Sequence, residues 1–172
     1  MNFHLDRLNG VHDIVRDKFF PFHHACVVAG QPLLIVHGWR SVKAQLLLYQ
    51  LGRTYDRESG VWTVAHPALV VTNSLPGRSA HNLIDHETGR AAALAVDIVP
   101  LDPSEKPKWD TTTDQEWHLI WEIAHQHGLD PLGDQVGDYL PWDKGHLQEP
   151  GYKYIMDTLG VMYPTSPTSK VI

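Results

Sequence analysis

Residues 79–97 read SAHNLIDHETGRAAALAVD and residues 143–148 read DKGHLQ, and the rest of the chain is organised around these two stretches. His81, Asp97 and His146 supply two imidazoles and a carboxylate. This is the ligand set typical of a catalytic zinc ion, which keeps a fourth position open for water. Asp143 lies three residues before His146, where it could accept a proton from such a water. The two stretches therefore predict a catalytic zinc centre.

Asp97 stands out from its surroundings, because residues 91–99 form an apolar run that is expected to end as a buried strand at Pro100. A carboxylate flanked by Val96 and Ile98 alternates to one face of that strand. Burying it without a partner costs several kcal/mol. Asp97 therefore needs either a metal or a hydrogen-bonding network, and we prefer the metal while both interpretations stay open.

Length and composition restrict the class of protein. At 172 residues the chain is expected to form one domain with a real core, and its single cysteine, Cys26, excludes an internal disulfide. The net charge of −6 comes with scattered basic residues, which excludes a nucleic-acid footprint. Charged residues interrupt the first thirty positions and no run approaches a membrane span, so we expect synthesis in the cytoplasm without a cleaved signal peptide, and no membrane partner.

The N-terminal part of the chain is expected to form a helix, a buried strand and a second helix. Apolar residues three and four apart predict a helix over about 5–29 that is broken near Pro21. The short apolar run 32–37 predicts the strand. A helix over 44–51 then follows, with Ser41 as its N-cap.

Turn residues dominate the middle of the chain. The polar segment 55–68 is expected to be a surface loop, and 69–72 a strand. The clearest helix begins later, where Thr113 and Glu116 form a capping box, and it ends at Gly128.

The C-terminal part is expected to contain the last ligand and little regular structure after it. Residues 141–148 fit a strand or the lip of a loop, with His146 projecting into the site. A final helix is expected over 152–162. Residues 164–172, rich in Ser, Thr and Pro, are expected to form a loose tail, which leaves 1–163 as the single domain.

Arg40 stands at the predicted junction between a strand and a helix, where side chains are often presented to clefts. A cation in a cleft and a surface salt-bridge residue are equally good interpretations on this evidence. Most of the twelve histidines are expected to be ordinary surface or packing residues if only two are ligands. This group includes His12, His23, His24, His118, His125 and His127. His118, His125 and His127 lack the spacing of an H-E-x-x-H zinc helix, and adjacent histidines such as His23 and His24 point different ways on a helix.

Taken in order, these landmarks resemble the zinc D,D-carboxypeptidase and L-alanyl-D-glutamate endopeptidase family, which holds VanY-like enzymes and many phage endolysins. The resemblance covers the chain from about Leu8 to about Gln148. The matching stretches are Gly38-Trp39-Arg40-Ser41, Gly52-Arg53-Thr54 followed by Val71-Thr72-Asn73, Ser79-x-His81, Ala95-Val96-Asp97 and Asp143-x-x-His146.

The resemblance implies an α+β fold of the Hedgehog and D,D-peptidase kind, with a small antiparallel sheet, flanking helices and a bound Zn²⁺. Carried over by position, the metal ligands would be His81, Asp97 and His146. Asp143 would be the general base. Arg40 would be a cleft cation that steadies the substrate or its oxyanion, and Ser79 would hold the substrate or its neighbours.

The sequence departs from the family pattern between the first two ligands. The family places the Asp much closer to the first His, whereas Asp97 follows His81 by sixteen residues. Residues 82–90 could loop out and leave both ligands adjacent, which loop-closure entropy permits cheaply. Alternatively, Asp85 or His86 replaces a ligand. We prefer the loop, and we expect it to border the cleft and reshape it.

Three functions compete under this resemblance. The first is an endolysin-like endopeptidase that cuts the peptidoglycan stem peptide between L-alanine and D-glutamate, acting on the cell wall after phage holin-type release. It is favoured by the Gly-Arg-Thr stretch at 52–54. The second is a D-alanyl-D-alanine carboxypeptidase or dipeptidase. The third is a non-catalytic, metal-stabilised wall-binding or virion module, which would have no chemical reason to keep Asp143. A monomer is expected in each case.

Overall fold

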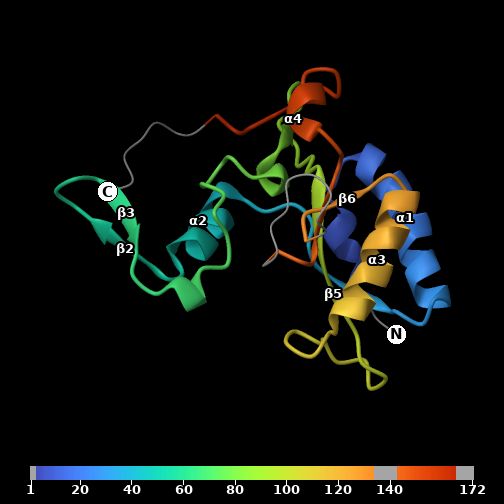
Figure 1. The fold of residues 1–172 in the computed structure, drawn as a ribbon. Helices are drawn as coiled ribbons and strands as arrows, with labels where there is room; N and C mark the ends of the chain where they lie inside the picture. Colours follow the sequence, from blue (N-terminus) through green and yellow to red (C-terminus); the bar gives the residue numbers. More distant parts are fainter. Residues whose placement is uncertain (1–2, 134–142, 166–172) are drawn as a thin grey trace.

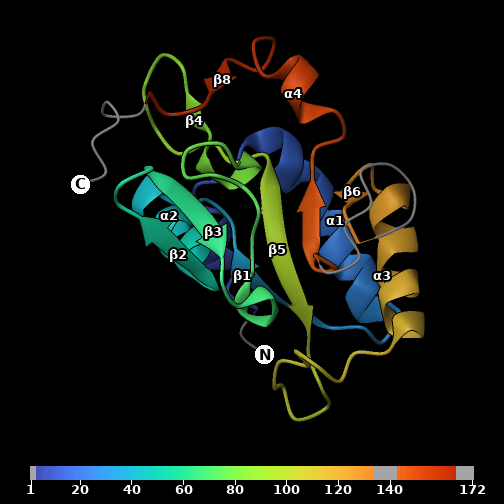
Figure 2. The same ribbon diagram turned by 60° about the vertical axis from the view of Figure 1, so that its left-hand side comes forward.

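The computed structural model describes residues 3–133 and 143–165. Its centre is an antiparallel sheet of four strands in the order β1-β5-β7-β6. Figure 2 shows β5 running through the middle of the molecule with β7 beside it. The predicted α+β fold with a small antiparallel sheet and flanking helices is confirmed. The strands are β1 Leu33–His37, β5 Ala95–Pro100, β6 Asp130–Pro131 and β7 His146–Gln148.

The two faces of this sheet differ in chemistry. Residues directly opposite on neighbouring strands point to the same face. One face is apolar and belongs to the core that the helices α1 and α3 cover (Figures 1 and 2). The other face carries Asp97, His146 and Gln148, because Asp97 pairs with His146 and Gln148 lies two residues further along β7. The apolar face is formed by Leu33, Ile35, Val96, Ile98 and Leu147.

The first predicted helix is divided differently from our expectation. A 3-10 turn, η1 Leu5–Leu8, precedes α1, which spans Asp13–Val28 and runs through Pro21 without a break. The interruption lies at residues 9–12, where Val11 forms a bridge with Ala93 of a distant segment. A tertiary contact thus decides where the helix starts. Pro21 is exposed and removes only one backbone donor from a helix whose buried face is anchored elsewhere.

The second predicted helix is confirmed as α2 Val42–Gln50, with Ser41 accepting a hydrogen bond from Ala44 N at 3.1 Å. The region after it was predicted wrongly in two places. The expected surface loop contains a hairpin, β2 Arg53–Asp56 and β3 Val61–Val64, which projects from the body of the molecule (Figure 1). The expected strand at 69–72 is not formed, and the 3-10 turn η2 Pro67–Leu69 stands at its start.

Helix α3, Asp114–Gln126, confirms the predicted capping box, since Thr113 Oγ1 accepts from Glu116 N. The helix also reaches the segment that carries the last ligand. Trp121 Nε1 donates a hydrogen bond to the carbonyl of Lys144 at 2.9 Å. Helix packing therefore holds the chain immediately before β7 in place.

The predicted final helix at 152–162 is wrong beyond its first turn. Helix α4 covers only Tyr152–Ile155, and the chain then turns into a short strand, β8 Val161–Met162. Strand β8 pairs with β4 Ile84–Asp85, which lies within the expected insert. Gly160 adopts a left-handed φ of 64° just before β8, so the turn has the residue it requires.

The segment before β7 and the C-terminal tail are described only in part. Residues 141–142 and 166–172 lie outside the described residues, so the predicted loose tail and the domain boundary at 163 stay predictions. Within the parts that are described, no helix is both long enough and apolar enough to cross a membrane.

Candidate metal centre

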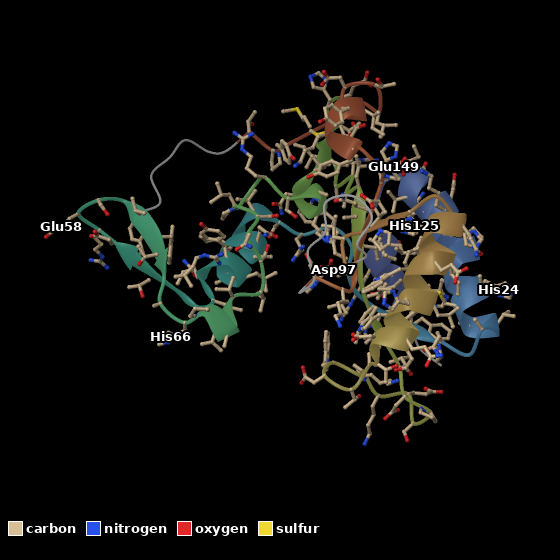
Figure 3. The ribbon with its side chains drawn as sticks, viewed as in Figure 1. His24, Glu58, His66, Asp97, His125 and Glu149 are labelled. Atoms are coloured by element: carbon tan, nitrogen blue, oxygen red, sulfur yellow. The ribbon has the colours of Figure 1, made fainter. Side chains whose placement is uncertain are left out.

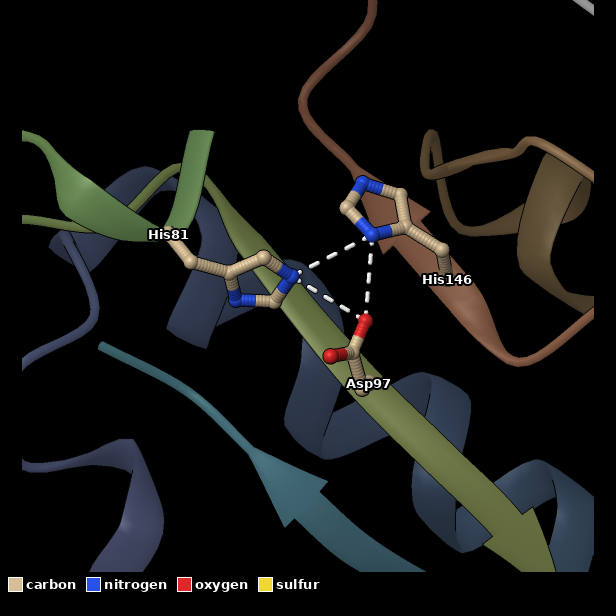
Figure 4. A group of neighbouring side chains, drawn as sticks. All are labelled: His81, Asp97 and His146. Atoms are coloured by element: carbon tan, nitrogen blue, oxygen red, sulfur yellow. Dashed lines mark hydrogen bonds and ion pairs between the residues drawn. The ribbon is translucent and has the colours of Figure 1, made fainter. Parts of the chain in front are cut away.

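The three predicted ligands come together on the polar face of the sheet (Figure 4). His81 belongs to the 3-10 turn η3, Ala80–Asn82, while Asp97 lies on β5 and His146 on β7. His81 Nε2 and His146 Nδ1 each lie 3.0 Å from Asp97 Oδ1, and the two nitrogens are 3.2 Å apart. Three potential ligand atoms thus face one common point.

The chemistry of these atoms fits a divalent cation. His81 Nδ1 lies 2.6 Å from the carbonyl oxygen of Gly38, so this nitrogen is the one that carries the ring hydrogen. A neutral His81 therefore presents an unprotonated Nε2 to the carboxylate of Asp97. Two acceptor atoms at 3.0 Å repel each other unless a cation lies between them. Two imidazoles and one carboxylate are ligands that suit zinc.

Local structure fixes each ligand. Ser79 and Asn82 form a capping box around η3, which sets the backbone of His81. Asp97 and His146 are opposite each other in the β5–β7 register. Gly145 permits this close pairing, because a Cβ at this position would lie 2.2 Å from the carbonyl oxygen of Ile98. The site is therefore built from the sheet rather than from loops alone.

The second oxygen of Asp97 has its own partners. His37 Nδ1 lies 3.5 Å and Arg40 Nη2 lies 3.4 Å from Asp97 Oδ2. The carboxylate thus turns Oδ1 toward the two other candidate ligands and Oδ2 toward the side chains of His37 and Arg40. Of the two interpretations of Asp97, the structure contains both a possible metal site and a hydrogen-bonding network.

Sequence reasoning missed His37. It comes opposite Asp97 because the register between β1 and β5 shifts between Ile35 and His37. That irregularity has no signal in the residue pattern. The only available hint was the position of His37 directly before the Gly38-Trp39-Arg40-Ser41 stretch.

Burial and charge shift the pKa values of the clustered groups. Burial lowers the pKa of His81 to about 4, so this imidazole is neutral at physiological pH. Burial opposes ionisation of Asp97, but its interactions with the surrounding imidazoles of His81, His146 and His37 hold the pKa of Asp97 well below its usual value. Burial likewise disfavours the charged form of His146, but Asp97 raises its pKa overall.

Asp143 is the group whose pKa is best placed for proton transfer near neutral pH. Burial raises the pKa of Asp143 to about 6. The charge of His146 opposes this rise, and the negative charge of Asp97 adds to it. A carboxyl group with such a pKa can both accept and release a proton under physiological conditions.

The polar face opens into a pocket of about 380 Å³. Five of the six predicted site residues line it, and His81 is fully buried behind them. A second hollow of about 330 Å³ also borders Asp97 and Asp143. The five lining residues are Arg40, Ser79, Asp97, Asp143 and His146.

Arg40 and Ser79 are both buried at the wall of this pocket. The Arg40 side chain is 10% exposed, and within the described residues its Nε has no hydrogen-bond partner. This favours the cleft-cation interpretation over a surface salt bridge. Ser79 Oγ accepts a hydrogen bond from His81 N at 3.3 Å, which leaves the hydroxyl hydrogen of Ser79 available as a donor.

The inserted segment does not reshape the pocket as we expected. None of residues 83–90 lines it, because β4 is paired with β8 instead. Asp85 Oδ1 accepts hydrogen bonds from both the backbone and the hydroxyl of Thr88, and neither Asp85 nor His86 joins the cluster of possible ligands. The loop alternative therefore describes the structure better than ligand replacement.

His23, His24 and His66 lie apart from the cluster. His23 Nε2 is 3.1 Å from the carbonyl oxygen of Leu33, and its ring packs against Phe3 and Phe19. Figure 3 shows His24 and His66 well away from Asp97. Among residues 3–133 and 143–165, the group of metal-binding side chains found close enough together is His81, Asp97 and His146.

No protein-family model matches this sequence, and no curated protein matches it either. Solved structures do match. The D,D-pentapeptidase VanY from a VanB-type vancomycin resistance cassette, a mutant in complex with Zn(II), is 15% identical with a TM-score of 0.53, and the match covers 87% of this chain and 78% of VanY. VanYB in complex with D-alanine-D-alanine is 15% identical with a TM-score of 0.51, over 87% and 76% of the two chains.

A third structure, the L,D-carboxypeptidase DacB from Streptococcus pneumonia, is 20% identical with a TM-score of 0.49, over 87% of this chain and 73% of DacB. At such identities the likeness concerns the fold. The two VanY matches extend over most of both chains. This chain therefore has an α+β fold similar to that of VanY.

Proposed function

We propose that this chain is a zinc-dependent peptidoglycan hydrolase that cleaves the stem peptide, most specifically the L-alanyl-D-glutamate bond. One observation carries the proposal. Three ligand atoms of His81, Asp97 and His146 converge within 3.0–3.2 Å beside a pocket, on a fold similar to that of VanY. VanY itself is a D,D-pentapeptidase that was solved with Zn(II).

The proposed reaction is hydrolysis of a peptide bond. His81 Nε2, Asp97 Oδ1 and His146 Nδ1 would hold the metal. A zinc ion at this position would supply Lewis acidity toward the scissile carbonyl and toward the attacking water. Asp143 would accept the proton of that water and then pass it to the leaving amine, for which a pKa of about 6 is suitable.

Arg40 and Ser79 would act on the substrate from the wall of the pocket. The Arg40 guanidinium is held by Asp97 on one side, and its Nε has no hydrogen-bond partner among residues 3–133 and 143–165. It would supply positive charge where the oxyanion develops, and its burial strengthens that interaction. Ser79 would donate its hydroxyl hydrogen to the substrate or to a neighbouring group.

The space at the site is compatible with an endopeptidase. An endopeptidase must accommodate peptide on both sides of the scissile bond, whereas a carboxypeptidase needs room for only a short leaving group. Two hollows, of about 380 and 330 Å³, are both lined in part by Asp97 and Asp143. The runner-up is a D-alanyl-D-alanine carboxypeptidase, favoured by the similarity to VanYB, which was solved with D-alanine-D-alanine.

Mass spectrometry of digested peptidoglycan tests the proposal. Purified peptidoglycan is incubated with zinc-loaded protein, and a chelated sample is run beside it. New free amino termini on D-glutamate that vanish with the chelator are the expected result. Release of D-alanine would identify the carboxypeptidase instead. Tightly bound metal without any product would indicate the non-catalytic wall-binding or virion module and refute hydrolysis.

Variants test the proposed roles separately. Asp143→Ala should keep zinc and lose turnover, because the ligands remain and the base is gone. His146→Ala should lose both. Asp157→Ala is a matched control, since Asp157 is exposed and does not line the pocket. Undiminished hydrolysis by the Asp143 variant would remove that residue from the mechanism.

A further inference from the structure

A chain of hydrogen bonds continues behind His146, away from the other ligands. His146 Nε2 lies 3.3 Å from Gln148 Oε1, and Gln148 Nε2 donates to Asp130 Oδ2 at 3.2 Å. Gln148 is 7% exposed, as is His146. The sheet dictates this arrangement, because Gln148 lies two residues after His146 on the same face of β7 and directly opposite Asp130 on β6.

The direction of each hydrogen bond follows from the chemistry of Asp130. An ionised carboxylate only accepts hydrogen bonds, so the amide nitrogen of Gln148 must face Asp130. The amide oxygen Oε1 then faces His146, and an oxygen there can only accept. The amide oxygen therefore favours the tautomer of neutral His146 that has its ring hydrogen on Nε2, while the Asp97 carboxylate, 3.0 Å from Nδ1, competes for that hydrogen until a metal occupies the site. In the favoured tautomer Nδ1 is the unprotonated nitrogen.

We propose that Gln148, oriented by Asp130, is a positioning residue that places the ring hydrogen of His146 on Nε2 and so prepares Nδ1 to bind the metal. The inference rests on the proposed function, because it assumes that the cluster binds zinc. Outer partners of this kind typically change metal affinity by about 10- to 100-fold when they are removed. Neither residue was identified from the sequence.

The comparison with His81 explains why two residues are needed here. The ring hydrogen of His81 faces the carbonyl of Gly38, a backbone oxygen that cannot exchange places with a donor. A glutamine side chain can rotate by half a turn and present its nitrogen instead. Asp130 prevents that rotation, since the turned amide would put two oxygens against each other. Gln148 supplies the acceptor and Asp130 supplies its orientation.

Three variants separate these two roles. Gln148→Met keeps the size of the side chain and removes the acceptor, so zinc affinity should fall by about tenfold or more. Asp130→Asn keeps the shape but releases the amide, so the loss should be smaller. The double variant Asp130→Asn with Gln148→Glu exchanges the two functional groups and again presents an oxygen to His146. It should recover most of the lost affinity.

Two measurements test the inference without relying on peptide hydrolysis. Zinc affinity is measured by competition with a chromophoric chelator. The position of the ring hydrogen is measured by long-range ¹H–¹⁵N NMR of zinc-free protein at alkaline pH, where imidazoles are neutral. The fraction of His146 with its hydrogen on Nε2 should be larger in the wild type than in Gln148→Met, and the double variant should resemble the wild type.

Gln45→Met is the matched control, because Gln45 is a fully buried amide on α2 that bonds to Thr72 and Ser74 and touches no ligand. It should lower stability and leave zinc affinity and the His146 signals unchanged. Unchanged zinc affinity in Gln148→Met, or an unchanged fraction of His146 with its hydrogen on Nε2, would overturn the inference. A wild type that binds zinc but hydrolyses nothing would refute the proposed function alone.

Discussion

Replacing Asp143 by asparagine should stabilise the zinc-free protein at neutral pH. Burial raises the pKa of Asp143 to about 6, above its ordinary value of 3.8. The folded state therefore binds this proton more tightly than the unfolded state does. The resulting stability is fully present below pH about 4 and is lost as the pH rises through about 6. An asparagine side chain does not ionise in this pH range, so the Asp143→Asn variant keeps this stability at every pH.

The two pKa values give the size of the effect. They are about two pH units apart, and each unit corresponds to about 1.4 kcal/mol, which makes the upper bound about 3 kcal/mol. Asp143 retains some access to solvent and lies near His146. Hydration and the charge of His146 both reduce the free-energy cost of ionising Asp143 in the folded state. We expect Asp143→Asn to raise the free energy of unfolding by about 1–3 kcal/mol above pH about 6.

Urea unfolding in the presence of a chelator measures this difference across the pH range. The free energy of unfolding of Asp143→Asn should equal that of the wild type below pH about 4. The difference should grow between pH about 4 and about 6 and stay constant above that. The same exchange at exposed Asp157 is the control and should show no such profile. A gain that is equal at all pH values, or a loss of stability at neutral pH, would refute the reasoning.

Three further predictions concern the same framework. Lys18→Met should destabilise the fold by about 2–4 kcal/mol in urea unfolding, because both carboxylate oxygens of buried Glu149 lie 2.6 Å from Lys18 Nζ and would lose their partner. Gly145→Ala should cost about 1–3 kcal/mol and weaken zinc binding in a chelator competition, since the added Cβ would meet the carbonyl of Ile98 at 2.2 Å; unchanged zinc affinity would contradict this. In steady-state hydrolysis, kcat/KM should rise with pH and level off above about 6, because Asp143 must be ionised to act as a base. A bound cation lowers the pH of that inflection. An inflection well above pH 6 would therefore exclude Asp143 as the general base.

The predicted ligands could be found in the sequence because each has a local signal. Asp97 is a carboxylate in an apolar run, and a buried charge in such a run needs an explanation. His81 follows Ser79, which caps the turn that carries it. The capping boxes and N-caps at Ser41 and Thr113 are likewise short-range, so the bounds of α2 and α3 were predicted well.

Most of the missed features depend on contacts between distant residues. His37 reaches Asp97 only through the irregular register of β1. The hairpin of β2 and β3 is the exception, because Tyr55 pairs with Trp62 only seven residues later; it was missed because the polar, Gly-containing composition of residues 55–68 was interpreted as a loop. The segment predicted as a helix up to Met162 instead ends in a strand, because β8 has β4 as a partner. Such pairings override local propensity, and no residue pattern within a short window announces them.

The polar face of the sheet brings three potential ligand atoms together. His81 Nε2, His146 Nδ1 and Asp97 Oδ1 lie within 3.0–3.2 Å, and burial disfavours the charged form of each group. The surrounding structure holds them in place through Gly38 behind His81 and Gln148 behind His146. Asp97 and a protonated His146 attract each other, but the neutral His81 presents a lone pair to the same carboxylate oxygen. A divalent cation binds all three atoms at once, and this is the physical reason for treating the cluster as a metal site rather than as a structural network.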